Sequence, residues 1–197
     1  QRLLKFIEKV ILRYKDSEAI EFWQVENEPF FLFGECPSPD KKLLRKEVNL
    51  VRSLDKERQI VITESGELSL YFKAAKFGDI IGHTLYREIW ISELNRYFNY
   101  PFPPVFYNRR AWLVNKLTHK EVMCVELQAE PWSPVLLYDS SLEEQKKTMD
   151  LNQFKKNISF ARNTGIDTFY LWGVEWWYWM KEVQKSDAIW KEAQTLF

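Results

Sequence analysis

The sequence predicts an α/β fold, a partial TIM or (β/α)8 barrel of about five parallel strands with covering helices. Helix and strand patterns alternate along the chain, which is typical of a parallel sheet covered by helices. The predicted strands are short apolar runs without polar alternation, as expected for strands buried on both faces. Polar residues collect where the strands end, and no glycine-rich phosphate loop follows a strand. A barrel is therefore favoured over a nucleotide-binding sheet.

The first elements follow from apolar spacing. Residues 3–14 carry apolar side chains at helical intervals and predict an amphipathic helix, and residues 19–25 then predict a strand. Asp40 is suited to cap a second helix, whose apolar positions run over residues 43–54. The short apolar run at residues 60–63 predicts the next strand.

The middle of the chain is less regular. Residues 68–75 fit a third helix, which we expect Gly78 to end in a left-handed cap. A strand follows at residues 79–82. Residues 86–107 form a long aromatic segment whose proline cluster predicts a loop, and residues 111–117 predict a helix.

The last third returns to alternation. Residues 122–125 predict a strand, and a Ser-Leu-Glu-Glu capping box at Ser141 predicts a helix that continues to residue 161 and stops at Gly165. Residues 167–172 predict the fifth strand, and residues 187–197 a final helix.

The composition bounds the function. With 197 residues, 46% apolar and 28% charged, the chain has a globular composition, and we expect one domain over residues 1–197. The 28 basic and 28 acidic side chains balance, and no basic run is long enough to follow a phosphate backbone, so no nucleic acid partner is expected. The longest aromatic and apolar run, residues 168–180, is too short to span a membrane and contains Glu175, so no membrane association is expected.

Cysteine and histidine are scarce. Only Cys36, Cys124, His83 and His119 are present, which excludes a disulfide framework and disfavours a metal site built from these residues. Cys124 lies in an apolar run and is expected to be buried. We therefore expect neither a metal nor a cofactor.

Carboxylates at two strand ends carry the strongest functional signal. Asn27 and Glu28 follow the first predicted strand, while Glu126 and Glu130 follow the strand at residues 122–125. Because the carboxyl ends of barrel strands meet at one face, this pattern is typical of hydrolases that use two carboxyl groups for acid and base chemistry.

These segments resemble a known superfamily. Residues 23–29, Trp-Gln-Val-Glu-Asn-Glu-Pro, resemble the Asn-Glu-Pro signature that closes the fourth barrel strand of clan A glycoside hydrolases, which include many cellulases, mannanases and β-galactosidases. Glu126 resembles the seventh-strand nucleophile of that clan. The resemblance implies that Glu28 is the general acid/base and that Asn27 holds the sugar 2-hydroxyl. Glu130 remains the alternative nucleophile.

The resemblance also implies substrate-binding residues. Tyr86 resembles the sixth-strand hydroxyl that hydrogen-bonds the nucleophile, with His83 as the alternative. Trp172 resembles the eighth-strand tryptophan that forms the floor of the sugar site. Trp132 is suited to stack on a sugar ring at an outer subsite, and Glu175 either binds a sugar hydroxyl or is solvated.

The resemblance implies a retaining glycoside hydrolase that cleaves β-linked oligosaccharides or polysaccharides. The alternative is a carbohydrate-binding protein or inactive relative that holds a glycan in the aromatic cleft. A barrel enzyme of another class is disfavoured, because no strand-end lysine is suited to a Schiff base and no His-Asp cluster to a metal.

The five predicted strands correspond to barrel strands four to eight, so the first three βα units are expected to be missing from residues 1–197. The two end strands would then present open apolar edges. Either the chain is a fragment or a partner completes the barrel, and self-association through these edges is one such route.

Overall fold

The computed structural model describes residues 2–32 and 40–197. The chain divides into two compact units. Unit 1 comprises Gln1–His83 and Arg109–Met123, and unit 2 comprises Thr84–Asn108 and Cys124–Phe197. Helices and parallel strands alternate along the described residues, which confirms the predicted fold class, a partial (β/α)8 barrel.

Five strands form the main sheet in the order β1-β2-β3-β6-β7. In unit 1, β1 pairs with β2, and β2 pairs with β3, so that Glu64 lies beside His83. In unit 2, β6 pairs with β7, and Gln128 lies beside Trp172. All of these pairings are parallel. The strands are β1 (Phe22–Gln24), β2 (Gln59–Glu64), β3 (Ile80–Leu85), β6 (Glu121–Gln128) and β7 (Phe169–Trp172).

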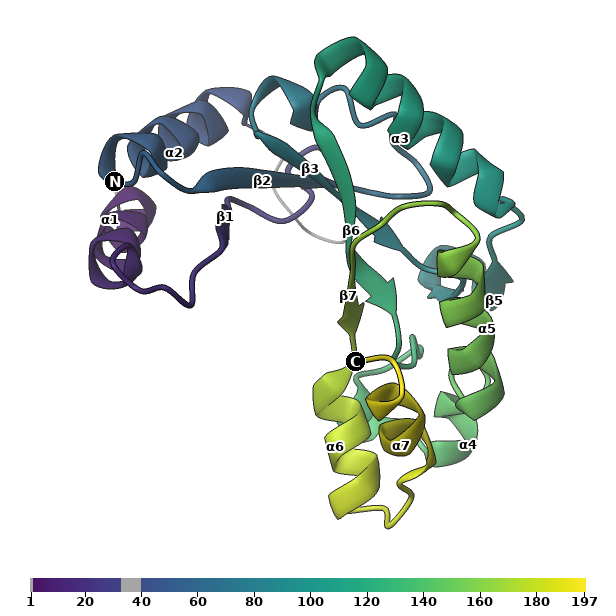
Figure 1. The fold of residues 1–197 in the computed structure, drawn as a ribbon. Helices are drawn as coiled ribbons and strands as arrows, with labels where there is room; N and C mark the ends of the chain where they lie inside the picture. Colours follow the sequence, from purple (N-terminus) through teal and green to yellow (C-terminus); the bar gives the residue numbers. More distant parts are fainter. Residues whose placement is uncertain (1, 33–39) are drawn as a thin grey trace. The chain divides into compact units, whose positions relative to one another are not determined.

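Two helices of unit 1 lie side by side, α1 (Arg2–Tyr14) and α2 (Lys41–Leu54) (Figure 1). Asp40 caps α2 as expected, because its carboxylate accepts hydrogen bonds from the N–H groups of Lys42 at 2.8 Å and Leu43 at 3.1 Å. The apolar faces of α1 and α2 pack against side chains of β2 and β3. The shared core includes Ile11, Val48, Val51, Ile60, Ile62 and Ile81.

The prediction of a third helix at residues 68–75 is wrong. Only one short 3-10 turn forms there, η1 (Ala74–Lys76). The hydroxyls of Ser65 and Ser69 accept nearby backbone N–H groups, and Tyr71 has a φ of +68°, which a helix cannot accommodate. These local hydrogen bonds compete with the helix.

The predicted left-handed cap at Gly78 is also wrong, because the φ of Gly78 is not positive. Glycine is required at this position because a side chain would clash with neighbouring backbone. A Cβ at this position would lie 2.8 Å from the backbone oxygen of Ile80 and 3.0 Å from the backbone nitrogen of Ile62.

The predicted loop at residues 86–107 contains an antiparallel hairpin of β4 (Glu88–Ile91) and β5 (Arg96–Asn99). A 3-10 turn, η2 (Ser92–Leu94), and the left-handed Asn95 connect the two strands. The β-branched and aromatic residues on both sides of that asparagine were the available signal. Next comes α3 (Pro104–Thr118), which starts seven residues before the prediction, since a proline is tolerated at the first helical position.

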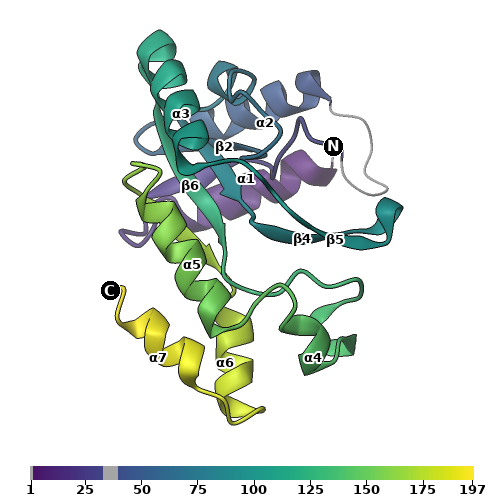
Figure 2. The same ribbon diagram turned by 90° about the vertical axis from the view of Figure 1, so that its right-hand side faces the viewer.

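Unit 2 contains four more helices, of which α5, α6 and α7 are grouped together (Figure 2). The predicted helix at residues 141–161 is two helices, because Asp150 accepts the N–H of Gln153 at 2.7 Å and starts a new one. Gly165, with a φ of +69°, lies beyond its end as expected. The helices are α4 (Leu142–Gln145), α5 (Leu151–Arg162), α6 (Val174–Glu182), which was not predicted, and α7 (Ala188–Gln194).

Cys124 is fully buried, as expected, whereas Cys36 lies outside the described residues. In residues 2–32 and 40–197, no helix is both long and apolar enough to cross a membrane.

A buried carboxyl group in unit 1 makes the stability of the fold depend on pH. Glu47 of α2 is 1% exposed. Burial, followed by the charge and hydrogen bond of Glu26 and the charge of Asp40, raises the pKa of Glu47 to about 7 from 4.5. The folded state therefore holds a proton that the unfolded chain releases near pH 4.5.

Stability should therefore fall as the pH rises from about 4.5 through 7. Replacing Glu47 with the neutral Glu47→Gln should remove that loss, which amounts to as much as about 3 kcal/mol. Urea unfolding at pH 5 and pH 8 measures it. Glu57→Gln, at an exposed position, is the matched control. If both variants reduced the difference in unfolding free energy between pH 5 and pH 8 equally, the assignment to Glu47 would be contradicted.

Candidate active site

In unit 1 the Asn-Glu pair lies in a tight segment directly after β1. The N–H of Val25 donates a hydrogen bond of 3.1 Å to the backbone oxygen of Val61 in β2. The backbone then takes a φ of +64° at Glu26 and +44° at Glu28. Residues other than glycine adopt such angles at a cost, and they cluster at functional sites.

Thr63 of β2 holds both members of this pair. Its hydroxyl accepts the N–H of Glu28 at 2.7 Å and donates to Oδ1 of Asn27 at 3.3 Å. Thr63 has no exposed surface, so the neighbouring strand fixes the strained segment from the inside. Thr63 was not predicted as a functional residue, although its polar side chain at the end of the 60–63 apolar run was a signal.

His83 also belongs to unit 1. It lies on β3 with no exposed surface, and its ring stacks on Tyr71 at 5.5 Å between centroids. In this position the imidazole is part of the buried packing of unit 1.

In unit 2 the structure brings together three of the predicted residues: Glu126, Tyr86 and Trp132. The Tyr86 hydroxyl donates a 2.7 Å hydrogen bond to Oε2 of Glu126. The ring of Trp132 meets that of Tyr86 edge to face at 5.0 Å. Burial raises the pKa of Glu126, and the hydrogen bond from Tyr86 lowers it in part.

Glu126 lies at an irregularity in its strand. The pairing of β6 with β7 shifts between Cys124 and Leu127, so Val125 and Glu126 together stand opposite the single residue Tyr170. Such an extra residue turns a side chain away from the position that strict alternation would give it, and bulges are common beside active sites.

Gln128 holds the segment that carries Tyr86. This side chain is 1% exposed. Its Oε1 accepts the N–H groups of Arg87 at 2.8 Å and Glu88 at 3.0 Å, and its Nε2 donates to the oxygen of Glu88 at 2.6 Å. Asn157 of α5 donates to the backbone oxygen of Gln128 at 3.0 Å. Sequence reasoning missed Gln128, whose only signal was an amide two positions after Glu126.

Glu130 and Trp172 are bonded to each other. The indole N–H of Trp172 donates to Oε1 of Glu130 at 2.8 Å. Burial raises the pKa of Glu130, the hydrogen bond from Trp172 opposes that rise, and the charge of Glu175 adds to it.

This pair depends on Gly173. Gly173 has a φ of +144°, and a Cβ there would lie 2.8 Å from the backbone of Ala129 and 2.9 Å from Cβ of Glu130. Only glycine allows the two segments to lie this close.

Comparison of the sequence with family models and with curated proteins finds no match. Among solved structures, the chain is similar to an FMN-binding β-glucuronidase of Faecalibacterium prausnitzii L2-6 (TM-score 0.54, 14% identity) and a β-D-glucuronidase of Dictyoglomus thermophilum (TM-score 0.54, 16% identity). It is also similar to a fungal β-1,4-galactanase (TM-score 0.57, 12% identity). The chain shares the fold of the part of each of these proteins that it matches.

The extent of the match differs among these proteins. The alignments cover 87%, 86% and 94% of this chain, but 25% and 28% of the two glucuronidases and 61% of the galactanase. The chain thus spans less than two thirds of each of these proteins. The fold expected from the resemblance is confirmed.

The amide of Gln128 should be essential for the geometry around Tyr86. Gln128→Met keeps an unbranched side chain but leaves two N–H groups and one carbonyl without that partner, which should lower the free energy of unfolding by at least about 3 kcal/mol. Urea unfolding measures the loss. Gln153→Met removes an amide that bonds Asn157 at 2.8 Å on α5 and should cost about 1 kcal/mol. Equal losses of unfolding free energy in the two variants would argue against a special role for the buried amide of Gln128.

Proposed function

We propose that this chain belongs to a retaining glycoside hydrolase in which Glu126 is the nucleophile and Glu28 is the general acid/base. One observation carries the proposal: the phenol of Tyr86 donates to the carboxylate of Glu126, near the carboxyl end of the parallel strand β6. The glycosidase fold of the structural neighbours supports it. Barrel enzymes place their chemistry at the carboxyl ends of the strands.

The chemistry of Glu126 suits a nucleophile. A nucleophile must be ionised, and burial opposes ionisation. The hydrogen bond from Tyr86 favours the charged form and leaves one carboxylate oxygen to react. A partly desolvated carboxylate held at a fixed angle is more reactive than one in water.

The reaction proceeds in two displacements. An oxygen of Glu126 bonds to the anomeric carbon while the glycosidic bond breaks, and Glu28 transfers its proton to the departing oxygen. A water then attacks the same carbon, Glu28 takes the proton of that water, and the bond to Glu126 breaks. The configuration is retained, which requires the carboxyl carbons to lie about 5 to 5.5 Å apart.

The remaining predicted residues have roles around these two. Asn27 hydrogen-bonds the sugar 2-hydroxyl, and Trp172 forms the floor of the site. Trp132 stacks on a ring at an outer subsite, while His83 supports the strand end. The substrate is a β-linked oligosaccharide or polysaccharide, consistent with the β-glycosidases among the structural neighbours.

The chain forms an incomplete barrel that lacks three βα units. In the sheet order, β1 and β7 are the edge strands. These edges are where further strands or a second copy of the chain pair with the sheet.

Chemical rescue tests the two assignments. Glu126→Ala should abolish hydrolysis of 2,4-dinitrophenyl β-glycosides of glucose, galactose and mannose, and azide should restore it with an inverted glycosyl azide as product. Glu28→Ala with azide should give the retained azide instead. Product configuration by nuclear magnetic resonance distinguishes the two.

The same experiment separates the alternatives. If azide rescues Glu130→Ala with inversion and leaves Glu126→Ala inactive, then Glu130 is the nucleophile. Glu28→Gln should lower kcat by about 10²- to 10⁴-fold while glycan binding persists. If wild type and Glu28→Gln bind glycan equally and neither cleaves any glycoside, the chain is a carbohydrate-binding protein.

The Tyr86 hydroxyl should control the acidic limb of the pH profile. Tyr86→Phe removes a hydrogen bond that lowers the pKa of Glu126, so this pKa should rise and the acidic limb in kcat/KM should move to higher pH. Tyr97→Phe is the matched control, because the Tyr97 hydroxyl bonds Glu144, a different carboxylate of unit 2. Equal shifts in both variants would contradict the assignment.

A further inference from the structure

A second feature of unit 2 is a hollow of about 220 Å³ beside Glu130. It is lined by Glu130, Leu137, Tyr138, Glu175, Trp176 and Trp179. Glu130 follows the end of β6, and Glu175 lies in the first turn of α6, directly after β7. The hollow therefore opens at the carboxyl ends of these two strands, where barrel enzymes bind their substrates.

A buried amide fixes one wall of the hollow. Gln145 of α4 is 1% exposed. Its Nε2 donates to the oxygens of Leu137 at 2.9 Å and Ser140 at 3.1 Å, and its Oε1 accepts the indole N–H of Trp176 at 2.8 Å. The turn that carries Tyr138 and the helix that carries Trp176 are thus joined, so the hollow is largely preformed.

The Glu130 side of the hollow is held by residues that follow or end the two strands. Trp172 bonds Glu130 through its indole N–H at 2.8 Å, and Trp177 donates to the backbone oxygen of Ala129 at 2.7 Å. Trp172 therefore holds the Glu130 carboxylate, and Trp177 holds the backbone of the residue before it.

The lining combines aromatic surface with carboxylates. Tyr138, 78% exposed, presents its ring to solvent at the rim. Aromatic faces pack against the C–H faces of sugars, and carboxylates accept hydrogen bonds from hydroxyls. The volume is smaller than the roughly 300 to 1,000 Å³ typical of drug-sized ligands, which suits a single ring.

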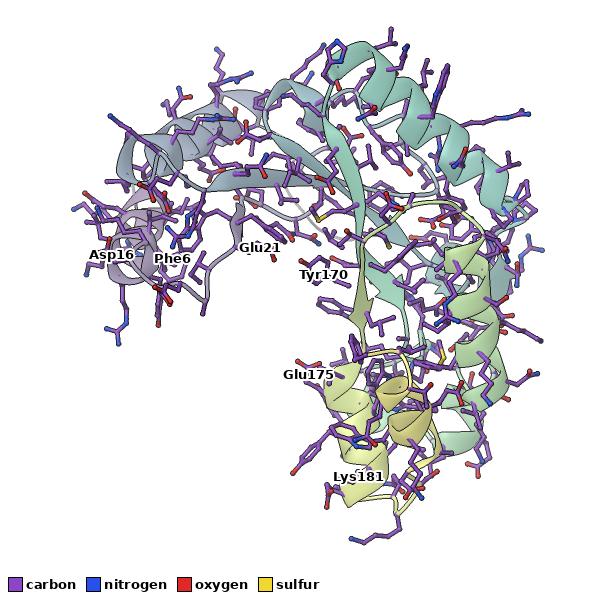
Figure 3. The ribbon with its side chains drawn as sticks, in the orientation of Figure 1. Phe6, Asp16, Glu21, Tyr170, Glu175 and Lys181 are labelled. Atoms are coloured by element: carbon purple, nitrogen blue, oxygen red, sulfur yellow. The ribbon has the colours of Figure 1, made fainter. Side chains whose placement is uncertain are left out.

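None of the six lining residues is basic. Lys181 lies on the same helix as Glu175, but at the far end of α6 from it (Figure 3). There its ammonium lies 4.9 Å from the ring centre of Trp190 and 2.9 Å from Glu182. The hollow thus contains two acidic side chains, and the basic residue of its own helix is engaged elsewhere.

We propose that this hollow is a subsite for an uncharged sugar ring and that Glu130 and Glu175 exclude uronic acids from it. The inference rests on the proposed function and narrows its substrate class. A uronate carboxylate about 6 Å from one of these charges, at an effective dielectric constant of about 20, is disfavoured by about 100-fold. The chain thereby differs in specificity from the β-glucuronidases whose fold it shares.

Binding of matched glycosides tests the proposal without turnover. Calorimetry measures Kd for methyl β-D-glucoside against methyl β-D-glucuronide, and for the galactose pair, which differ only in a hydroxymethyl or carboxylate group at C6. In at least one pair the neutral glycoside should bind about 100-fold more tightly than its uronide. The proposal is overturned if the uronides bind as well as the neutral glycosides or if none of the four binds.

Charge reversal locates the effect. Glu175→Lys should shift the ratio of the two Kd values at least about tenfold toward the uronide, and Glu175→Gln should give a smaller shift in the same direction. Glu182→Lys makes the same charge change two turns along α6 and should leave the ratio unchanged. Equal shifts at both positions would indicate a general charge effect and overturn the assignment.

Failure of this inference is distinguishable from failure of the proposed function. Loss of hydrolysis in Glu126→Ala with equal binding of both glycosides rejects the subsite alone. Selective binding of neutral glycosides without any cleavage of the aryl glycosides rejects the hydrolase alone.

Discussion

The buried amide of Gln128 makes three hydrogen bonds to the segment that follows β3, and the candidate site of unit 2 depends on them. Tyr86 immediately precedes the two N–H groups that this amide accepts, so the amide determines where the phenol lies. The phenol in turn orients Glu126. A buried polar network of this kind rigidifies a site because each unmade hydrogen bond would cost free energy in the low-dielectric interior.

The same principle operates at two other places. Thr63 fixes the Asn27–Glu28 pair in unit 1, while Gln145 fixes the aromatic hollow in unit 2. Gly173 acts through shape, because its missing side chain lets the segment after β7 approach the segment after β6. In each unit, residues of a neighbouring element hold the segment that carries a carboxylate that we propose acts on the substrate. Carboxylates positioned in this way need less reorganisation when charge develops during the reaction.

The sequence predicted the fold well where apolar periodicity was strong. The five strands and the helices near residues 3–14 and 43–54 follow from burial of one face or of both faces, which local composition records. It failed at residues 68–75, where serine hydroxyls capture backbone N–H groups, and at residues 86–107, where the hairpin depends on Asn95 in a left-handed conformation. Such outcomes depend on competition between local hydrogen bonds and packing.

By itself the sequence determined the alternation of elements and the strand-end positions of Glu28, Glu126 and Glu130, because periodicity and composition decide which segments are buried. Only the tertiary structure decided that Tyr86 bonds Glu126 while Trp172 bonds Glu130. It also revealed Thr63, Gln128 and Gln145, whose partners are up to 41 residues away in the chain. Hydrogen bonds over such separations depend on strand register and helix packing, and the local pattern of residues contains no record of either.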